Sequence, residues 1–174
     1  MPDKDRELQA VLQDYAARGF TLACQLLGNT DDAAETVQDG LLVLWRNRAK
    51  LDSRRNPRGW FYRVVRNLCV DRLRRRRLQT TLPLDEARAP NERCGDPSGI
   101  AQANEYRTRL RRELEDMPPN LREILYLRDF HDLSYAEIAE VLSIPAGTVM
   151  SRLHRARMEL RDRMGRGDRR SDRG

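Results

Sequence analysis

The segment from Ser143 to Arg157, "SIPAGTVMSRLHRAR", carries residue types that can bind DNA. If it forms a helix of about 100° per residue, Val149 and Leu153 share a buried side and leave small, hydroxyl and cationic side chains outside. Arginine can bond to guanine edges or phosphates, as a helix in the major groove requires. The alternative is a solvated amphipathic helix with ordinary charges. The candidate DNA-contacting residues are Thr148, Met150, Ser151, Arg152, His154 and Arg155.

A second basic cluster lies earlier in the chain, in the polar segment 52–58 and the helix that we expect after it. Single-stranded DNA is held by cations on its phosphates and by aromatic or arginine stacking on its bases. Trp60 could instead belong to the core. Arg72 and the run 74–77 would hold duplex phosphates without sequence preference, or they are only solvated charges. The candidate residues for DNA binding and melting are Arg54, Arg55, Asn56, Arg58, Trp60, Arg63, Asn67 and Arg74.

A third group is acidic. Its carboxylates and amide recur three or four residues apart after "GNTD", so they form one stripe on a helix. Such a stripe can pair with a basic surface on another protein, although a solvated acidic face gives the same pattern. The candidate protein-binding residues are Asp32, Glu35, Gln38, Asp39 and Trp45.

Motifs for catalysis and metal binding are absent from the sequence. It has no P-loop, no nucleophile elbow and no glycine-rich phosphate loop. Its two histidines, His131 and His154, have no spacing that suits a shared metal. We therefore expect no enzymatic activity, no catalytic residue, no cofactor and no metal. Cys24 and Cys69 lie among apolar residues and are expected to be buried.

The distribution of charge divides the chain. The formal net charge is +6, and the basic excess lies in two segments that flank an acidic, proline-containing one. Two basic modules suit a polyanionic partner touched at two places. The predicted organisation is a module at 5–78, a flexible acidic linker at 79–105, a second module at 106–165 and a disordered basic tail at 166–174.

Helical periodicity dominates both modules, so the predicted fold is all-α, with two small helical domains. The first module has a helix ending at "GNTD", one starting at Asp31 or Asp32, and one from Pro57 to about Arg77 with an inner face formed by Phe61, Val64, Val65, Leu68 and Leu73. The second has a helix stopped by Pro118-Pro119. A helix over 120–130 with Phe130 inward, a helix capped by Ser134 and Glu137, and a helix from Pro145 follow. The last two form a helix-turn-helix.

Two sets of motifs resemble a known family. "LEDMPPNLREILYLRDFHDLSYAEIAEVLSIPAGTVMSRLHRARMELRDRM" resembles region 4 of an extracytoplasmic-function (ECF) sigma factor, a small member of the bacterial sigma-70 family. "LLGNTDDAAETVQDGLLVLWRNR" resembles the polymerase-binding helix of its region 2, and "NPRGWFYRVVRNLCVDRLRRRR" resembles its promoter-melting segment. Both sets, in this order with a linker between them, are specific to that family.

The resemblance implies a function in transcription initiation. Such proteins bind the core RNA polymerase, recognise the −35 element with region 4 and the −10 element with region 2, and aid DNA melting. It also implies an anti-sigma factor as a partner, with no small-molecule substrate. The N-terminus has no apolar signal core, so we expect a cytoplasmic protein without stable membrane insertion. Ala34, Met150 and His154 depart from residues that are frequent in the family. A helix-turn-helix regulator that never enters polymerase is the competing hypothesis.

Overall fold

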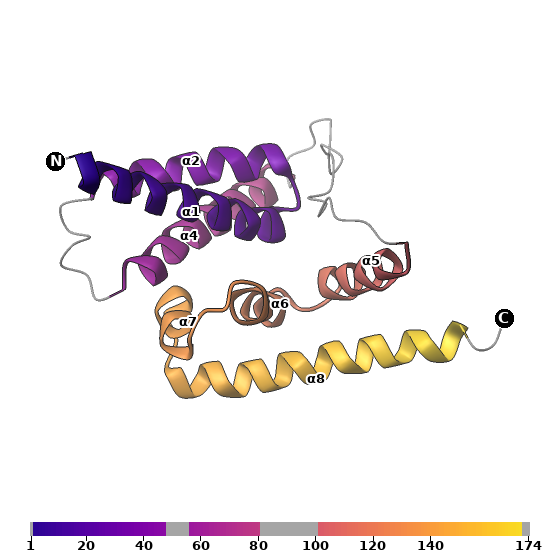
Figure 1. The fold of residues 1–174 in the computed structure, drawn as a ribbon. Coiled ribbons are helices and arrows are strands. Elements are labelled where there is room, and N and C mark those ends of the chain that lie inside the picture. The colour runs from indigo at the N-terminus through magenta and orange to yellow at the C-terminus, as the bar shows by residue number, and fades with distance from the viewer. Residues whose placement is uncertain (1, 48–55, 81–100, 172–174) are drawn as a thin grey trace. The chain divides into compact units, whose positions relative to one another are not determined.

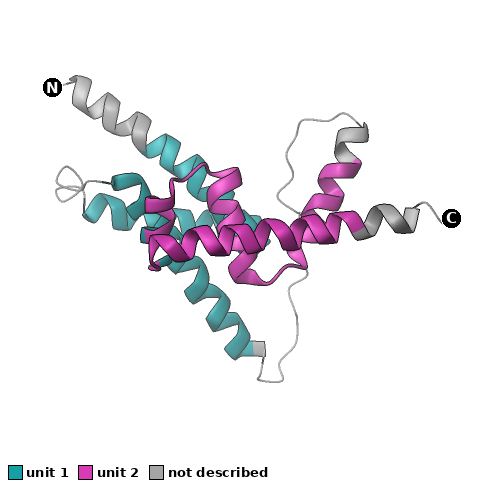
Figure 2. Cartoon of the chain, turned by 90° about the horizontal axis from the view of Figure 1, so that it is seen from below, with its two compact units in different colours: residues 1–95, 140–142 teal, residues 96–139, 143–174 magenta. Residues whose placement is uncertain are grey.

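The computed structural model of the chain describes the backbone of residues 2–47, 56–80 and 101–171 (Figure 1). The predicted contacts Arg54 and Arg55, and residues 81–100 of the predicted linker, lie outside these ranges. Every regular element in the described ranges is a helix, as the sequence predicts. The chain divides into two compact units, residues 1–95 with 140–142 and residues 96–139 with 143–174 (Figure 2).

Three helices that pack pairwise form the first unit: α1 (Pro2–Leu27), α2 (Thr30–Arg46) and α4 (Pro57–Thr80). Their shared core includes side chains that are almost fully buried, among them Leu22, Leu44, Phe61, Tyr62, Val65 and Cys69. The predicted inner face of α4 is confirmed at Phe61 and Val65. Tyr62 and Cys69 are buried as well. Because α4 packs against both α1 and α2, the buried part of its surface is wider than a single stripe of residues.

Two glycines let α1 and α2 approach α4 closely. A Cβ atom on Gly19 of α1 would lie 2.9 Å from Cε1 of Phe61, and one on Gly40 of α2 would lie 3.1 Å from Cγ2 of Val65. Phe61 is also stacked on Tyr15, with ring centroids 5.1 Å apart. The backbones of α1 and α2 therefore pack directly against the side chains of α4.

The junction between α1 and α2 is defined by its caps. Gly28, with a φ of 68°, donates its backbone N–H to the carbonyl of Cys24 at the end of α1. The side chain of Asn29 then accepts the backbone N–H of Asp32 at 2.9 Å. Asparagine is a preferred helix N-cap, so α2 begins at Thr30, slightly before the predicted start at Asp31 or Asp32.

The other described helices are α5 (Ala101–Glu115), α6 (Pro119–Leu125), the π-helical segment η1 (Tyr126–Phe130), α7 (Tyr135–Leu142) and α8 (Ala146–Ser171). All of them lie in the second unit except residues 140–142 of α7. Both α5 and α6 pack against α8. The predicted capping box at the start of α7 is present. The backbone N–H of Glu137 donates to Oγ of Ser134 at 3.2 Å, and the backbone N–H of Ser134 donates to the carboxylate of Glu137 at 2.8 Å.

The turn between α7 and α8 completes the predicted helix-turn-helix. Ser143 has a φ of 54°, which reverses the chain after α7. The carbonyl of Pro145 accepts the backbone N–H groups of Thr148 and Val149. Pro145 therefore caps α8 and is not its first residue, and the helix begins at Ala146.

The structure differs from the sequence-based prediction at Phe130. This side chain was predicted to point inward, but it is 51% exposed, while Tyr126 and Leu127 are buried. The cause is η1, because a π-helix has more residues per turn than an α-helix and therefore rotates the following side chains. An even 3.6-residue repeat cannot predict this rotation.

The helices also extend beyond their predicted ends. The backbone of α4 continues to Thr80 and that of α5 begins at Ala101, so both ends of the predicted linker 79–105 are helical. The backbone of α8 continues to Ser171, into the segment predicted as a disordered tail. Arginine favours helices and no proline interrupts α8 after Ala146, which accounts for the longer helix.

Candidate nucleic-acid and protein interfaces

The outer face of α8 is the first candidate surface. Val149, Leu153 and Ala156 are buried at no more than 1% exposure, as the sequence predicts. Their burial turns the opposite side of the helix to the solvent. Met150, Ser151, His154 and Arg155 are exposed there, whereas Thr148 and Arg152 are half-buried.

Ser151 and Arg157 of α8 already have partners within the unit. The hydroxyl of Ser151 donates to the carbonyl of Thr148 at 3.1 Å. Arg157 pairs with Asp129 of η1, with 2.6 Å between Nη2 and Oδ1, and this hydrogen bond raises the pKa of Arg157. Arg155 is exposed on the same helix, which makes it a well-placed cation for a partner in solution.

The outer face of α4 is the second candidate surface. Arg63, Asn67, Asp71 and Arg74 are all exposed and recur three or four residues apart, so they share one face of the helix. Trp60 is only partly buried. Its side chain is therefore neither fully within the core nor fully exposed.

The start of α4 gives two of the predicted DNA contacts a local structural role. Oδ1 of Asn56 accepts the backbone N–H of Gly59 at 2.9 Å, so Asn56 is the N-cap of the helix. The guanidinium of Arg58 lies 5.8 Å from the ring centroid of Tyr62, within the range of a cation–π interaction. The phenol of Tyr62 is buried, and burial raises its pKa.

The acidic stripe on α2 is the third candidate surface. Glu35, Gln38 and Asp39 are exposed, and Trp45 is 49% exposed. The structure therefore places these four side chains at the surface of the first unit. Asp32 differs, because its side chain is only 17% exposed.

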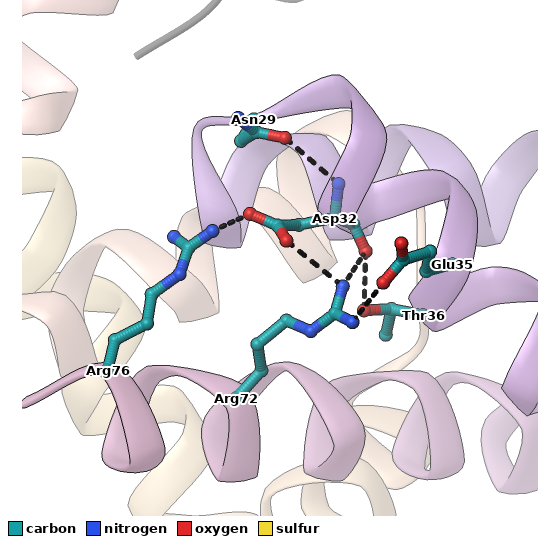
Figure 3. A network of polar contacts seen from close by, with 6 residues as sticks. All are labelled: Asn29, Asp32, Glu35, Thr36, Arg72 and Arg76. Carbon is teal, nitrogen blue, oxygen red and sulfur yellow. Dashed lines mark hydrogen bonds and ion pairs between the residues drawn. The ribbon is translucent and has the colours of Figure 1, made fainter. Parts of the chain in front are cut away.

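Asp32 is the centre of a polar network between α2 and α4 (Figure 3). Nη1 of Arg72 donates to the carbonyl oxygen of Asp32 at 2.8 Å and to its Oδ1 at 3.2 Å. Nη2 of Arg72 pairs with Glu35, and Arg76 pairs with Oδ2 of Asp32. The hydroxyl of Thr36 also donates to the carbonyl of Asp32, at 2.6 Å. The network connects the start of α2 to the second half of α4.

Reasoning from the sequence missed the roles of Arg72, Arg76 and Asp129. The four-residue separation of Arg72 and Arg76 does indicate a common face. However, no local spacing identifies Asp32, forty positions from Arg72, as their partner. Asp129 and Arg157 are likewise twenty-eight positions apart, so only the packed helices reveal the pair.

No helix in the described ranges has the length and apolar character to cross a membrane. Within the same ranges, no three histidine, cysteine, aspartate or glutamate side chains gather as a metal site would require. His131 is buried and His154 is exposed.

Two family models match the chain. "Sigma-70 region 2" matches residues 11–79, and "Sigma-70, region 4" matches residues 107–160. The first match covers α2 and the described part of α4 up to Gln79, with the acidic stripe and the arginines of the network. The second covers the helix-turn-helix and most of its exposed face.

Curated relatives align with most of the chain. The chain is 34% identical over 155 residues to the ECF RNA polymerase sigma factor SigE of Mycolicibacterium smegmatis, covering 87% of this chain and 59% of that protein. It therefore spans less than two thirds of the SigE relative. It is 26% identical over 162 residues to the ECF RNA polymerase sigma factor SigW of Bacillus subtilis, covering 88% and 87% of the two chains.

Solved structures share the fold. The sigma factor RpoE in complex with the anti-sigma factor NepR, from Bartonella quintana, matches with a TM-score of 0.66 and 23% identity over 95% of this chain and 98% of that one. CnrH in complex with the cytosolic domain of CnrY matches with a TM-score of 0.66 and 20% identity, covering 92% and 89%. The chain belongs to the ECF sigma factors of the sigma-70 family.

Proposed function

We propose that the chain binds the core RNA polymerase and directs it to promoters by recognising a −35 and a −10 element and aiding DNA melting. One observation carries this proposal: a single chain contains matches to both sigma regions, at residues 11–79 and 107–160. A sigma factor has to contact two promoter elements, and each of the two basic units can contact one of them. The proposed boundaries of the parts remain 5–78, 79–105, 106–165 and 166–174.

Region 4 would recognise the −35 element through the outer face of α8. A helix in the major groove reads base edges with its N-terminal residues, and this end of α8 has exposed small and cationic side chains. Arg155 is suited to a bidentate contact with guanine. The backbone N–H groups at the start of α8 favour a neighbouring phosphate. The proposed contacts are Thr148, Met150, Ser151, Arg152, His154 and Arg155.

Region 2 would recognise and melt the −10 element through the outer face of α4 and the segment before it. Opening a duplex exposes bases that can stack on aromatic or guanidinium planes. Arg63 and Asn67 are exposed for such contacts, and Trp60 has a partly exposed ring. The proposed contacts are Arg54, Arg55, Asn56, Arg58, Trp60, Arg63, Asn67 and Arg74.

The polymerase would bind the acidic stripe of α2. Gln38, Asp39 and Trp45 are exposed there and combine charge, hydrogen-bonding capacity and apolar surface. Glu35 is exposed but also pairs with Arg72, and Asp32 is mostly covered. We therefore assign the direct contacts to Glu35, Gln38, Asp39 and Trp45, with Asp32 supporting them from beneath.

We further propose that the protein is cytoplasmic, has no enzymatic activity of its own and is held inactive by an anti-sigma factor. One of the solved structures above, that of the sigma factor RpoE, contains an anti-sigma factor, NepR. An inhibitor that competes with polymerase would cover the exposed stripe of α2. Competition between an inhibitor and the core enzyme for this stripe would support the assignment.

Run-off transcription with core polymerase and genomic DNA fragments, followed by mapping of the start sites, tests the function. We expect transcripts from specific sites only when the protein is added. The absence of any promoter-specific transcript would refute the proposal. Co-purification with core polymerase separates it from the competing hypothesis, because a helix-turn-helix regulator that acts alone would bind duplex DNA but not the core enzyme.

A further inference from the structure

The arginines near the end of α4 do not share one environment. Arg72 and Arg76 are four residues apart, so they lie on the same face of the helix, and both reach Asp32 of α2 (Figure 3). Arg74 lies about half a turn away from them. Its side chain is 75% exposed, and Arg75 is also exposed. The run therefore has one face toward α2 and another toward solvent.

Arg72 uses its guanidinium within the fold. Its two terminal nitrogens contact three oxygen atoms, the carbonyl and Oδ1 of Asp32 and a carboxylate oxygen of Glu35. The side chains of Arg72 and Asp32 are only 27% and 17% exposed. Withdrawing Arg72 toward a phosphate would leave a partly buried carboxylate with fewer partners, which is unfavourable. Arg72 is thus poorly placed to bind DNA.

Arg74 and Arg75 are placed differently. Among the described residues, the partner of Arg74 is Asp71, at a long distance of 3.9 Å between side chains that are 75% and 53% exposed. An exposed pair of this length is readily replaced by another anion. Arg74 also continues the face of Arg63 and Asn67, so it would follow the same DNA strand away from the melted bases.

We propose that this arginine run consists of two classes. Arg72 and Arg76 are positioning residues that hold the start of α2 against α4, and Arg74 and Arg75 bind the phosphates of duplex DNA. The assignment rests on the proposed function, because it takes promoter DNA as the natural polyanion. It corrects the prediction from sequence that Arg72 and the whole run 74–77 serve the same purpose. It also assigns Asp32 to the architecture of the first unit, which leaves Glu35, Gln38 and Asp39 as the acidic and amide contacts for a partner.

The first test measures stability. Both tryptophans of the chain, Trp45 and Trp60, belong to the first unit, so their fluorescence reports the unfolding of that unit in the full chain. We expect Arg72→Gln to lower the urea midpoint and Arg75→Gln to leave it unchanged. Arg72→Lys should lower the midpoint as well, because an ammonium cannot reproduce the forked contacts of a guanidinium.

The second test measures the binding of the full chain, without polymerase, to a plain DNA duplex at several salt concentrations. Each phosphate contact contributes about 0.9 to the slope of log K against log salt concentration. Arg74→Gln and Arg75→Gln should each reduce the magnitude of the slope by about this amount. Arg75→Lys should keep the wild-type slope, since lysine also neutralises a phosphate. Arg72→Lys should keep it too, in conditions where the variant is folded.

The outcomes separate this proposal from the function itself. An unchanged slope for Arg74→Gln and Arg75→Gln, or no duplex binding by the wild type, would overturn the phosphate assignment. An unchanged midpoint for Arg72→Gln would overturn the positioning role. Either result can occur while run-off transcription still succeeds. Conversely, the salt slopes and urea midpoints could change as expected while no promoter-specific transcript is formed. That result would refute the sigma-factor function alone.

Discussion

Arg157 of α8 donates a hydrogen bond from Nη2 to Oδ1 of Asp129 in η1, at 2.6 Å. The pair joins α8, the helix proposed to recognise the −35 element, to the π-helical segment of the same unit. Both side chains are partly exposed, at 51% and 39%. Exposed ion pairs contribute at most about 1 kcal/mol, so a DNA phosphate can compete with Asp129 for Arg157.

Replacing Asp129 should therefore strengthen DNA binding. Asp129→Asn removes the competing carboxylate and frees Arg157 for a phosphate. We expect tighter binding to a −35 duplex and a slope of log K against log salt that is steeper by about 0.9, the value of one additional contact. Fluorescence anisotropy of a labelled duplex, measured with the full chain over a range of salt concentrations, gives both quantities.

Asp162→Asn is the matched control, because Asp162 is an exposed aspartate further along α8. It changes the net charge by the same amount without touching Asp129. A steeper slope in both variants would indicate a general charge effect. An unchanged slope in Asp129→Asn would mean that Arg157 does not move to DNA.

Arg155→Ala should weaken recognition of the −35 element. Arg155 is exposed on the outer face of α8, and a bidentate contact to a guanine contributes roughly 1–3 kcal/mol of discrimination. The difference in binding between a native and a base-substituted −35 duplex should therefore shrink. Competition binding with both duplexes measures this difference. Arg161→Ala, an exposed arginine beyond the candidate face, should leave it unchanged. Equal weakening on both duplexes would reassign Arg155 to a phosphate.

Asn67→Ala should impair promoter opening more than duplex binding. The side chain of Asn67 is exposed on α4, so its removal does not disturb the core, and contacts to extruded bases form only after melting. Permanganate reactivity of thymines in the −10 region measures opening by the holoenzyme. Retention of duplex DNA by the same holoenzyme measures closed binding. Equal loss in the two assays would place the melting surface elsewhere. Trp60→Ala should behave similarly, although its partly buried ring also contributes to packing.

High pH should destabilise the first unit through Tyr62. Burial raises the pKa of this phenol above its ordinary value of 10.0. The fold therefore favours the neutral form. The contribution of the phenol to stability is fully present below its ordinary pKa and is lost as the pH rises through the raised pKa of the folded state. Urea unfolding followed by tryptophan fluorescence at pH 8 and at pH 11 should show this loss. Tyr62→Phe should reduce the pH dependence, and an equal dependence in that variant would exclude Tyr62 as the cause.

The sequence predicts the helical content and the inward face of α8 well, because both follow from local periodicity. Val149, Leu153 and Ala156 are buried as their spacing predicts, and the capping box of Ser134 and Glu137 forms as expected. These features depend only on neighbours within a few residues, so they can be predicted without knowing how the helices pack.

The roles of polar side chains are harder to predict, because they depend on partners that are distant in sequence. Asp32 carries the spacing of a protein-binding stripe, but the packing of α4 places Arg72 and Arg76 on it. Asn56 was predicted to contact DNA, and in the structure its side chain caps the start of α4. Phe130 is exposed because the π-helical segment rotates it outward. Tertiary packing determines the role of Asp32, whereas the local backbone determines the roles of Asn56 and Phe130.

The contact between Gly19 and Phe61 gives a last prediction, on stability. A Cβ on Gly19 would lie 2.9 Å from Cε1 of Phe61. The ring of Phe61 is fully buried and stacked on Tyr15, so it has little room to move. Overpacking of this kind costs roughly 1–3 kcal/mol. We expect Gly19→Ala to lower the free energy of unfolding of the first unit, measured in urea by tryptophan fluorescence.

Ala17→Gly on the exposed side of the same helix separates packing from helix propensity. Glycine is less favourable than alanine in a helix by about 1 kcal/mol, so Ala17→Gly should destabilise the unit by about this amount. If propensity alone decided the outcome, Gly19→Ala would stabilise the unit to a similar extent. Destabilisation by both substitutions, which are opposite in chemistry, would show that the close approach of α1 to Phe61 outweighs the gain in helix propensity. A more stable Gly19→Ala variant would contradict the packing of α1 on α4 described above.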